Sequence, residues 1–80
     1  MKPYKVREWR QHFGLTQGQL AYGAGIDRVS VARYETGPAD PKVATAVKLA
    51  GAMGITVFEL RQSPTMVEEL ARPMAGGENR

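Results

Sequence analysis

The residues that start and stop helices divide this sequence into short segments, and their spacing restricts the fold more than any other feature. Gly14, Gly25 and Gly54 each follow a run in which apolar residues recur at helical spacing. Glycine readily takes the left-handed conformation that often ends a helix. Nowhere do apolar and polar residues alternate over enough positions to predict a strand. The pattern therefore predicts an all-α fold of short helices joined by tight turns.

Two capping-box patterns mark helix starts within the chain. In this motif a threonine side chain accepts a hydrogen bond from the N–H at the third helical position. The glutamine or glutamate at that position bonds back to the threonine N–H. Thr16 with Gln19, and Thr56 with Glu59, have this spacing. They predict the starts of the second and the fifth helix.

Proline and aspartate predict the other three helix starts. Pro3 suits a first helical turn and predicts a first helix from Tyr4 onward. Asp27 is a favourable N-cap for the third helix. Asp40 followed by Pro41 predicts the start of the fourth helix, with the proline at its first position.

A chain of 80 residues allows one domain, and we expect it to span residues 3–61. Residues 62–80 are expected to form a C-terminal extension, with a short amphipathic helix at 65–72 and a disordered tail from Pro73 onward. The inward-facing apolar residues of the five helices predict a core of Val6, Trp9, Phe13, Leu20, Ala21, Ala24, Ile26, Val31, Tyr34, Val43, Ala46, Val47, Leu49, Ala50, Met53, Val57 and Leu60.

Basic residues are concentrated in the first half of the chain. The net charge is +3, and residues 1–42 carry seven basic and four acidic residues, whereas residues 43–80 carry four of each. An excess of positive charge on part of a small domain favours a polyanion such as nucleic acid as its partner. A solubilising surface explains the charge equally well.

Composition disfavours several classes of function. The chain has no cysteine, which excludes disulfides and thiolate metal sites. His12 is the one histidine, and no partner stands at a suitable spacing, so we expect no catalytic residues, no metal site and no cofactor. No apolar run suits a signal peptide or a membrane span, and we expect a cytoplasmic protein without membrane contact.

The second and third helices are predicted to form a helix-turn-helix. Gly25 permits a sharp turn between them. Ala21 is small enough for the helices to cross closely, and Ile26 and Val31 fill the crossing. Helices in this motif meet at roughly 90–120°. The second helix of the pair is then able to enter a major groove about 12 Å wide.

A larger set of residues has the types and spacing typical of one family. They are Leu15, Thr16, Gln17, Leu20, Ala21, Gly25, Ile26, Val31, Arg33, Glu35 and Gly37, followed by Pro41, Leu49, Ala50, Met53, Gly54, Ile55 and Leu60. In them the chain resembles the phage repressor/Cro family of helix-turn-helix domains. The resemblance implies a five-helix repressor-like domain that binds double-stranded DNA. It also implies a transcriptional regulator, expected to be a repressor that binds an inverted repeat as a homodimer.

The resemblance implies that the third helix contacts DNA. Arginine recognises guanine in the major groove and valine contacts the thymine methyl group, so we expect bases to be read by Arg28, Val29, Ala32 and Arg33. Phosphate contacts are expected from Thr16, Gln17, Ser30, Thr36 and Lys42. For each arginine, a phosphate contact or a solvated charge remains the alternative. Tyr34 is assigned to the core, with a phosphate contact as its alternative.

Two further groups of residues are assigned a role. Related repressors pair an arginine of the first helix with a glutamate that ends the third, here Arg10 and Glu35, and such a pair matters more when it is partly buried than when it is exposed. Both recognition helices of a dimer must face the same way, so the dimer interface is expected at the opposite end of the domain, around Phe58, Met66 and Leu70. The alternative for Phe58 is a residue that only covers the end of the core.

The alternative function is a protein-binding module, such as the antitoxin of a toxin–antitoxin pair. Many antitoxins of this fold bind both DNA and a toxin, so a toxin partner does not exclude DNA binding. A longer toxin-binding tail would favour this alternative, whereas residues 61–80 provide one short candidate helix.

Overall fold

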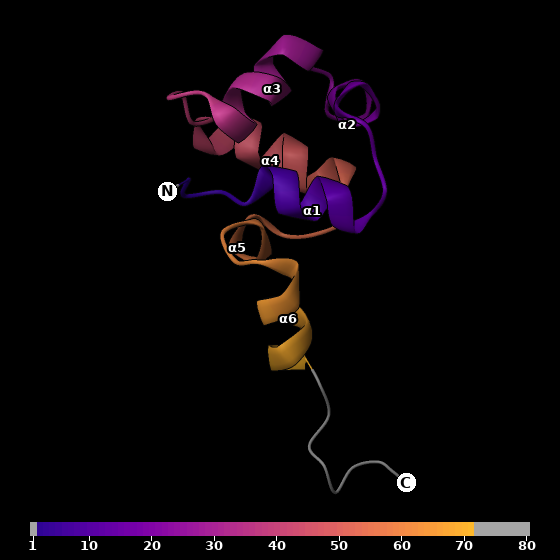
Figure 1. Ribbon diagram of the computed structural model, residues 1–80, viewed down its shortest axis with the longest axis vertical. Coiled ribbons are helices and arrows are strands. Elements are labelled where there is room, and N and C mark those ends of the chain that lie inside the picture. Colours follow the sequence, from indigo (N-terminus) through magenta and orange to yellow (C-terminus); the bar gives the residue numbers. More distant parts are fainter. Residues whose placement is uncertain (1, 72–80) are drawn as a thin grey trace, which may run out of the picture.

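The computed structural model describes residues 2–71, and this part of the chain contains six α-helices and no strand. The all-α fold is as predicted, and Figure 1 shows the arrangement of the helices. Their bounds are α1 Val6–His12, α2 Gln17–Ala24, α3 Arg28–Thr36, α4 Val43–Ala52, α5 Val57–Leu60 and α6 Pro64–Ala71.

Three of the helices end in the same hydrogen-bonded turn at a glycine. After α2, the Gly25 N–H donates to the Tyr22 carbonyl at 3.2 Å and the Ile26 N–H donates to the Ala21 carbonyl at 3.0 Å. This is a Schellman motif, and Gly25 has the positive φ of 70° that it requires. The arrangement recurs at Gly14 with Leu15 and at Gly54 with Ile55. The apolar residue after each glycine packs against the core, so each turn directs the chain inward.

Both capping boxes are formed. The Gln19 N–H donates to the Thr16 hydroxyl at 3.0 Å, and the Thr16 N–H donates to the Gln19 side-chain carbonyl at 2.8 Å. Thr56 and Glu59 make the equivalent pair of bonds at the start of α5. Asp27 occupies the N-cap position of α3 as predicted, but its side chain makes no capping hydrogen bond.

Two helices begin later than the sequence predicts. The prediction that α1 starts near Pro3 is wrong, because the Lys5 N–H donates to the Leu60 carbonyl at 2.8 Å and holds the preceding chain against α5. The predicted cap at Asp40 is also wrong, since this carboxylate pairs with the Lys2 ammonium at 3.0 Å. Pro41 is buried and precedes α4, and Lys42 is the N-cap residue of this helix.

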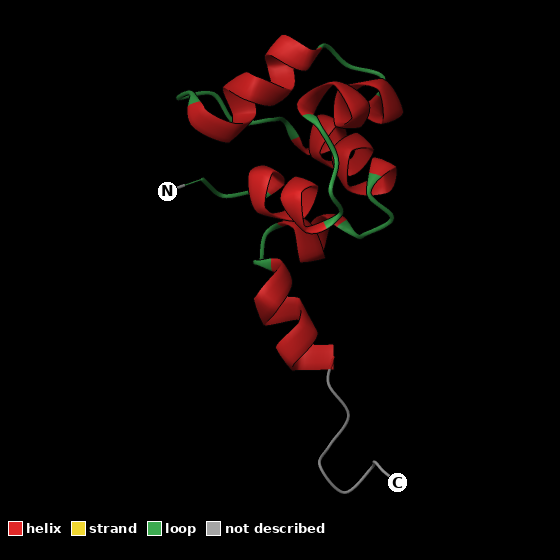
Figure 2. Ribbon diagram, turned by 45° about the vertical axis from the view of Figure 1, so that its right-hand side comes forward, coloured by secondary structure: helices red, strands yellow, loops and turns green. Residues whose placement is uncertain are grey.

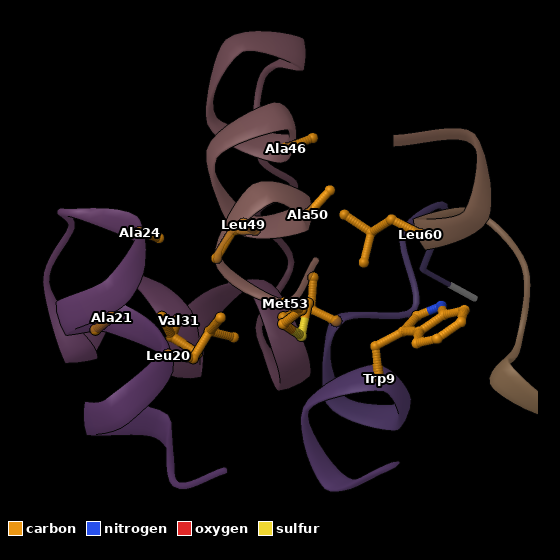
Figure 3. Close-up of a cluster of buried hydrophobic side chains, with 11 residues drawn as sticks. Trp9, Leu20, Ala21, Ala24, Val31, Ala46, Leu49, Ala50, Met53 and Leu60 are labelled. Atoms are coloured by element: carbon orange, nitrogen blue, oxygen red, sulfur yellow. The ribbon is translucent and has the colours of Figure 1, made fainter. Parts of the chain in front are cut away.

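The core lies between α1, α2, α3, α4 and α5 (Figure 3). Its fully buried side chains include Leu20 of α2, Val31 of α3, Leu49 of α4 and Leu60 of α5. Trp9 of α1 is buried beside them, and its indole N–H lies within hydrogen-bond distance of the carbonyls of Glu59 (3.0 Å) and Gln62 (2.7 Å). The indole therefore fixes the C-terminal end of α5 on α1. The remaining buried apolar residues are Val6, Ala21, Ala24, Ala46, Ala50 and Met53.

Three residues expected in the core are exposed instead. Phe13 is the C-cap residue of α1 and stacks its ring on that of Trp9, with 44% of its surface exposed. Val43 and Val47 lie one turn apart on α4, and 66% and 52% of their surfaces are exposed. The buried face of α4 consists of residues 46, 49, 50 and 53, which leaves the two valines outside its narrow contact stripe.

The helix α6 projects from the rest of the domain along its long axis (Figures 1 and 2). Pro64 is buried and Val67 packs against the core, while α6 contacts α1. It begins one residue earlier than the expected 65–72, and residue 72 lies outside the described residues. The tail expected to be disordered from Pro73 onward lies outside the described residues.

Candidate nucleic-acid interface

The helices α2 and α3 form the pair joined by the Gly25 turn. Ala21 is 3% exposed and Val31 is fully buried, so the two helices meet through a small residue and a branched one, as the sequence predicts. Tyr34 also packs against the core from α3. These contacts leave the opposite face of α3 directed away from the domain, at the end of the molecule farthest from α6 (Figure 1).

The outward face of α3 carries the residues assigned to DNA bases. Arg28, Val29 and Arg33 are exposed, and Ala32 between them is half-buried. Residues spaced by four along a helix lie on the same face, so Arg28 and Ala32 form one row and Val29 and Arg33 the next. Two arginines and two short apolar side chains therefore share one surface.

Each of these arginines lies against a glycine of a neighbouring segment. The Arg28 Cδ would be 3.8 Å from a Cβ placed on Gly18, at the start of α2. The Arg33 carbonyl and Cγ would be 2.9 and 3.2 Å from a Cβ placed on Gly37, which follows α3. The outward face of α3 is thus flanked by the N-terminus of α2 and by the segment from 37 to 42.

A polar network beneath this surface joins three helices. The Arg10 Nε donates to Glu35 Oε2 at 2.6 Å and its Nη2 donates to Oε1 at 3.1 Å, while Nη1 donates to the Leu15 carbonyl at 2.7 Å. The Gln17 amide donates to Glu35 Oε1 at 3.1 Å. The side chains of Glu35 and Arg10 are 1% and 13% exposed, so the pair is largely buried.

The charge of Arg10 is stabilised by this arrangement. The hydrogen bond to Glu35 raises the pKa of Arg10, burial opposes the rise, and the negative charge of Glu35 adds to it. The guanidinium therefore stays protonated at physiological pH, and the bidentate contact fixes α1 to the C-terminal turn of α3.

The five residues assigned to phosphate contacts differ in whether a side-chain hydrogen-bond donor is still available for an external acceptor. One Gln17 amide hydrogen bonds Glu35, which leaves a second for an external acceptor. The Thr16 hydroxyl accepts from Gln19 and retains its own hydrogen. Lys42 is exposed at the start of α4 and Ser30 is half-buried. The Thr36 hydroxyl instead donates to the Ala32 carbonyl at 3.1 Å, so in this structure its hydrogen is already used.

The profile of one family matches this chain over residues 6–60, and its description is helix-turn-helix. The chain belongs to this helix-turn-helix family. The resemblance to repressor/Cro-type domains that the residues suggested is thereby confirmed.

The chain is similar to transcriptional regulators of known sequence. It is 35% identical to the cryptic phage CTXphi transcriptional repressor RstR of Vibrio cholerae over 66 residues, which cover 81% of this chain and 60% of the repressor. It therefore spans less than two thirds of that repressor. It is 30% identical to an uncharacterized HTH-type transcriptional regulator of Archaeoglobus fulgidus over 56 residues, covering 70% of this chain and 80% of the regulator. The family comprises transcriptional regulators and not enzymes, as expected.

Two solved structures share the fold. The restriction-modification controller protein C.AhdI of Aeromonas hydrophila has a TM-score of 0.67 and 38% identity, covering 70% of this chain and 85% of that one. The hypothetical transcription factor NHTF of Neisseria has a TM-score of 0.70 and 26% identity, covering 85% of this chain and 76% of that one.

Lys2, to which the sequence assigned no role, lies next to the outward face of α3. The Lys2 ammonium contacts the chain segment that follows α3. The contacting residues are separated by 35 or more positions in sequence, so no local pattern predicts them.

The opposite end of the domain carries the residues assigned to the dimer interface. Phe58 of α5 is 74% exposed, and Met66 and Leu70 of α6 are 51% and 71% exposed. Leu60 is fully buried and Val57 packs against the core, which leaves Phe58 outside. Phe58 therefore does not cover the end of the core in this structure. Within residues 2–71 no helix has the length and apolar character to cross a membrane, and no group of acidic or histidine side chains has the arrangement of a metal site.

Proposed function

We propose that this chain is a sequence-specific, double-stranded DNA-binding transcriptional regulator that acts as a repressor. The observation that carries the proposal is the outward face of α3, where two exposed arginines flank short apolar side chains at the end of the domain. In the proposal this face enters the major groove. The similarity to a phage transcriptional repressor supports the same conclusion. Such a regulator works where the chromosome is, which in a bacterium is the cytoplasm.

The flanks of α3 support a role for DNA phosphates as well as bases. The N-terminus of α2 presents free N–H groups, which attract anions such as phosphate. Gln17 has an amide hydrogen available there, and Lys42 lies beyond the opposite flank. In the proposal these groups, with Thr16 and Ser30, hold the two sugar-phosphate chains that border the groove.

The two arginines receive different roles in this proposal. Arg33 lies in the second row of the outward face, beside Val29, and is proposed to bind a guanine through its fork of donors. The stem of Arg28 lies against the start of α2, next to the phosphate-binding groups. This placement favours a phosphate contact for Arg28, with base recognition as its second role.

A homodimer completes the proposal. In the proposal, two copies meet through Phe58, Met66 and Leu70 about a twofold axis, side by side, so that both α3 helices face the same duplex. Two half-sites about 34 Å apart, one helical turn of DNA, then form an inverted repeat. Exposed aromatic and long apolar side chains on so small a domain favour an interface of this kind.

A selection from random DNA duplexes tests this function. Sequencing of the retained duplexes is expected to show two related half-sites with dyad symmetry. Binding to the selected duplex should weaken steeply as salt rises, because phosphate contacts release counterions. Retained sequences without any common site, or an affinity that does not change with salt, would contradict the proposal.

A further inference from the structure

We propose that Lys2 is a positioning residue for DNA binding, which holds the segment from 37 to 42 in the shape that meets the phosphate chain. The proposal rests on the DNA-binding function proposed above. It goes beyond that function because Lys2 lies outside the helix-turn-helix and outside the family match at residues 6–60.

The Lys2 ammonium has three partners in one segment. Its Nζ donates to the Gly37 carbonyl at 2.7 Å and to the Ala39 carbonyl at 2.6 Å, and it lies 3.0 Å from Asp40 Oδ1. A lysine ammonium has three N–H donors and no acceptor. The three partners therefore use all of its donors, and none is left for a phosphate of DNA.

The segment held in this way has few other ways to be fixed. Pro38 and Pro41 lack backbone N–H groups, so the segment has little capacity for backbone hydrogen bonds of its own. The carbonyls of Gly37 and Ala39 bond the ammonium instead. Hydrogen bonds to a charged donor are stronger than neutral ones, and the Lys2 side chain is only 26% exposed.

The position of the segment explains why its shape matters. It begins at Gly37, against which the stem of Arg33 lies, and it ends at Lys42. The segment also carries Asp40, whose negative charge would repel a phosphate chain. Lys2 therefore has two effects on the same segment: it fixes the backbone between two DNA-contacting residues, and it neutralises the carboxylate between them.

The variant Lys2→Met, in the full chain with any purification tag at the C-terminal end, tests the proposal. Lys5→Met is the matched control, because it also removes one positive charge from the residues before α1. The Lys5 side chain makes no hydrogen bond or ion pair within the described residues. In the free protein, the NMR order parameters of the Ala39 and Asp40 amides should fall from about 0.85 to about 0.6 in Lys2→Met alone. Unchanged order parameters would overturn the proposal, whether or not the chain binds DNA.

The same variants separate positioning from a direct contact. Lys2→Met should bind the selected duplex about tenfold more weakly than Lys5→Met does, because a flexible segment must be ordered on binding. The dependence of affinity on salt should have the same slope in both variants. A slope that falls by about one phosphate contact in Lys2→Met alone would show that Lys2 binds DNA directly and would overturn the proposal.

The double variant Lys2→Met/Asp40→Asn separates positioning from neutralisation. It lacks both the ammonium and the carboxylate, so the segment stays flexible while the repulsive charge is gone. Binding should remain well below that of the original chain. Full recovery of affinity would mean that Lys2 only neutralises Asp40, which would overturn the positioning role. Failure of the original chain to bind any duplex would count against the proposed function, and the order parameters would still decide whether Lys2 fixes the segment.

Discussion

The two ends of the domain along its long axis differ in how their surfaces are held. At the α3 end, polar pairs hold the elements together: Glu35 binds Arg10 and Gln17, and Lys2 binds the segment after α3. At the α5–α6 end, the prominent side chains are apolar, exposed and held only by the helices that carry them, as Phe58 and Leu70 illustrate.

This difference has a physical meaning for binding. The buried pairs fix the backbone that carries the exposed Arg28 and Arg33, so less freedom is lost when this surface meets a polyanion, and this favours DNA at the α3 end. Exposed apolar area lowers the free energy when it is removed from water, and this favours a protein surface at the α5–α6 end. In the proposed function, DNA therefore binds at the α3 end and the second subunit at the α5–α6 end.

The largest expected effect is on the buried pair at the α3 end. Glu35→Ala removes the partner of the Arg10 guanidinium, which is then left largely buried and unpaired. The free energy of unfolding should fall by about 3–5 kcal/mol, as measured by urea denaturation. Glu8→Ala is the control, because this residue is exposed on α1 and should cost little. Equal and small losses from both variants would show that the network contributes no more than a surface pair.

The next effect concerns the apolar end. Phe58→Lys should weaken the dimer by about 2 kcal/mol or more, so that the mass in solution falls to that of a monomer while circular dichroism is unchanged. Tyr22→Lys is the control, since Tyr22 is an aromatic residue on α2 that is even more exposed than Phe58, at 91% against 74%. A dimer that persists in Phe58→Lys would place the contact elsewhere, and an unfolded chain would show that Phe58 is needed for folding although it is exposed.

A smaller effect separates the two arginines of α3. Arg33→Ala should cost about 1–3 kcal/mol at the selected duplex and relax the preference at one base position. Arg28→Ala should weaken binding to all duplexes by a similar factor, because its stem lies beside the start of α2. The measurement is the affinity of each variant for the selected duplex and for single-base changes of it. Identical and sequence-independent losses would show that Arg33 contacts only phosphate.

The smallest effects come from two glycines. Gly51 lies within α4 with open space around its Cβ position, so Gly51→Ala should raise the free energy of unfolding by about 0.5–1 kcal/mol. At Gly37, a Cβ would lie 2.9 Å from the Arg33 carbonyl, so Gly37→Ala should lower the free energy of unfolding. Urea denaturation of both variants shows whether each substitution raises or lowers the free energy of unfolding. A gain in stability at Gly37 would contradict the close contact that orders this flank of α3.

The sequence predicts those parts of the fold that depend on neighbouring residues. The capping box of Thr16 and the turn at Gly25 involve bonds within a few positions, so their residue types are enough to predict them. The exposure of Phe13 and Val47 was not predicted, because helical periodicity does not show how wide a stripe the neighbouring helices cover. Asp40, which was predicted to cap α4, pairs instead with Lys2, a contact between residues far apart in the sequence.

In the candidate site, too, features set by neighbouring residues were predictable and features set by contacts between distant residues were not. The outward face of α3 follows from its periodicity and from the helix-turn-helix pattern. The glycines that flank Arg28 and Arg33, and the bond between Gln17 and Glu35, depend on how the helices pack. The exposed face of α3 and the Arg10–Glu35 pair were therefore predictable, but the contacts of Gly18, Gly37 and Gln17 were not.

The assignment of DNA to one end is tested most directly by NMR of the isotopically labelled chain titrated with the selected duplex. Backbone amide shifts should change at residues 16–18 and 28–33 and at Gly37, Ala39, Asp40 and Lys42, and remain unchanged on addition of DNA at Phe58 and along α6. Changes confined to the α5–α6 end, with α3 unaffected, would contradict the account.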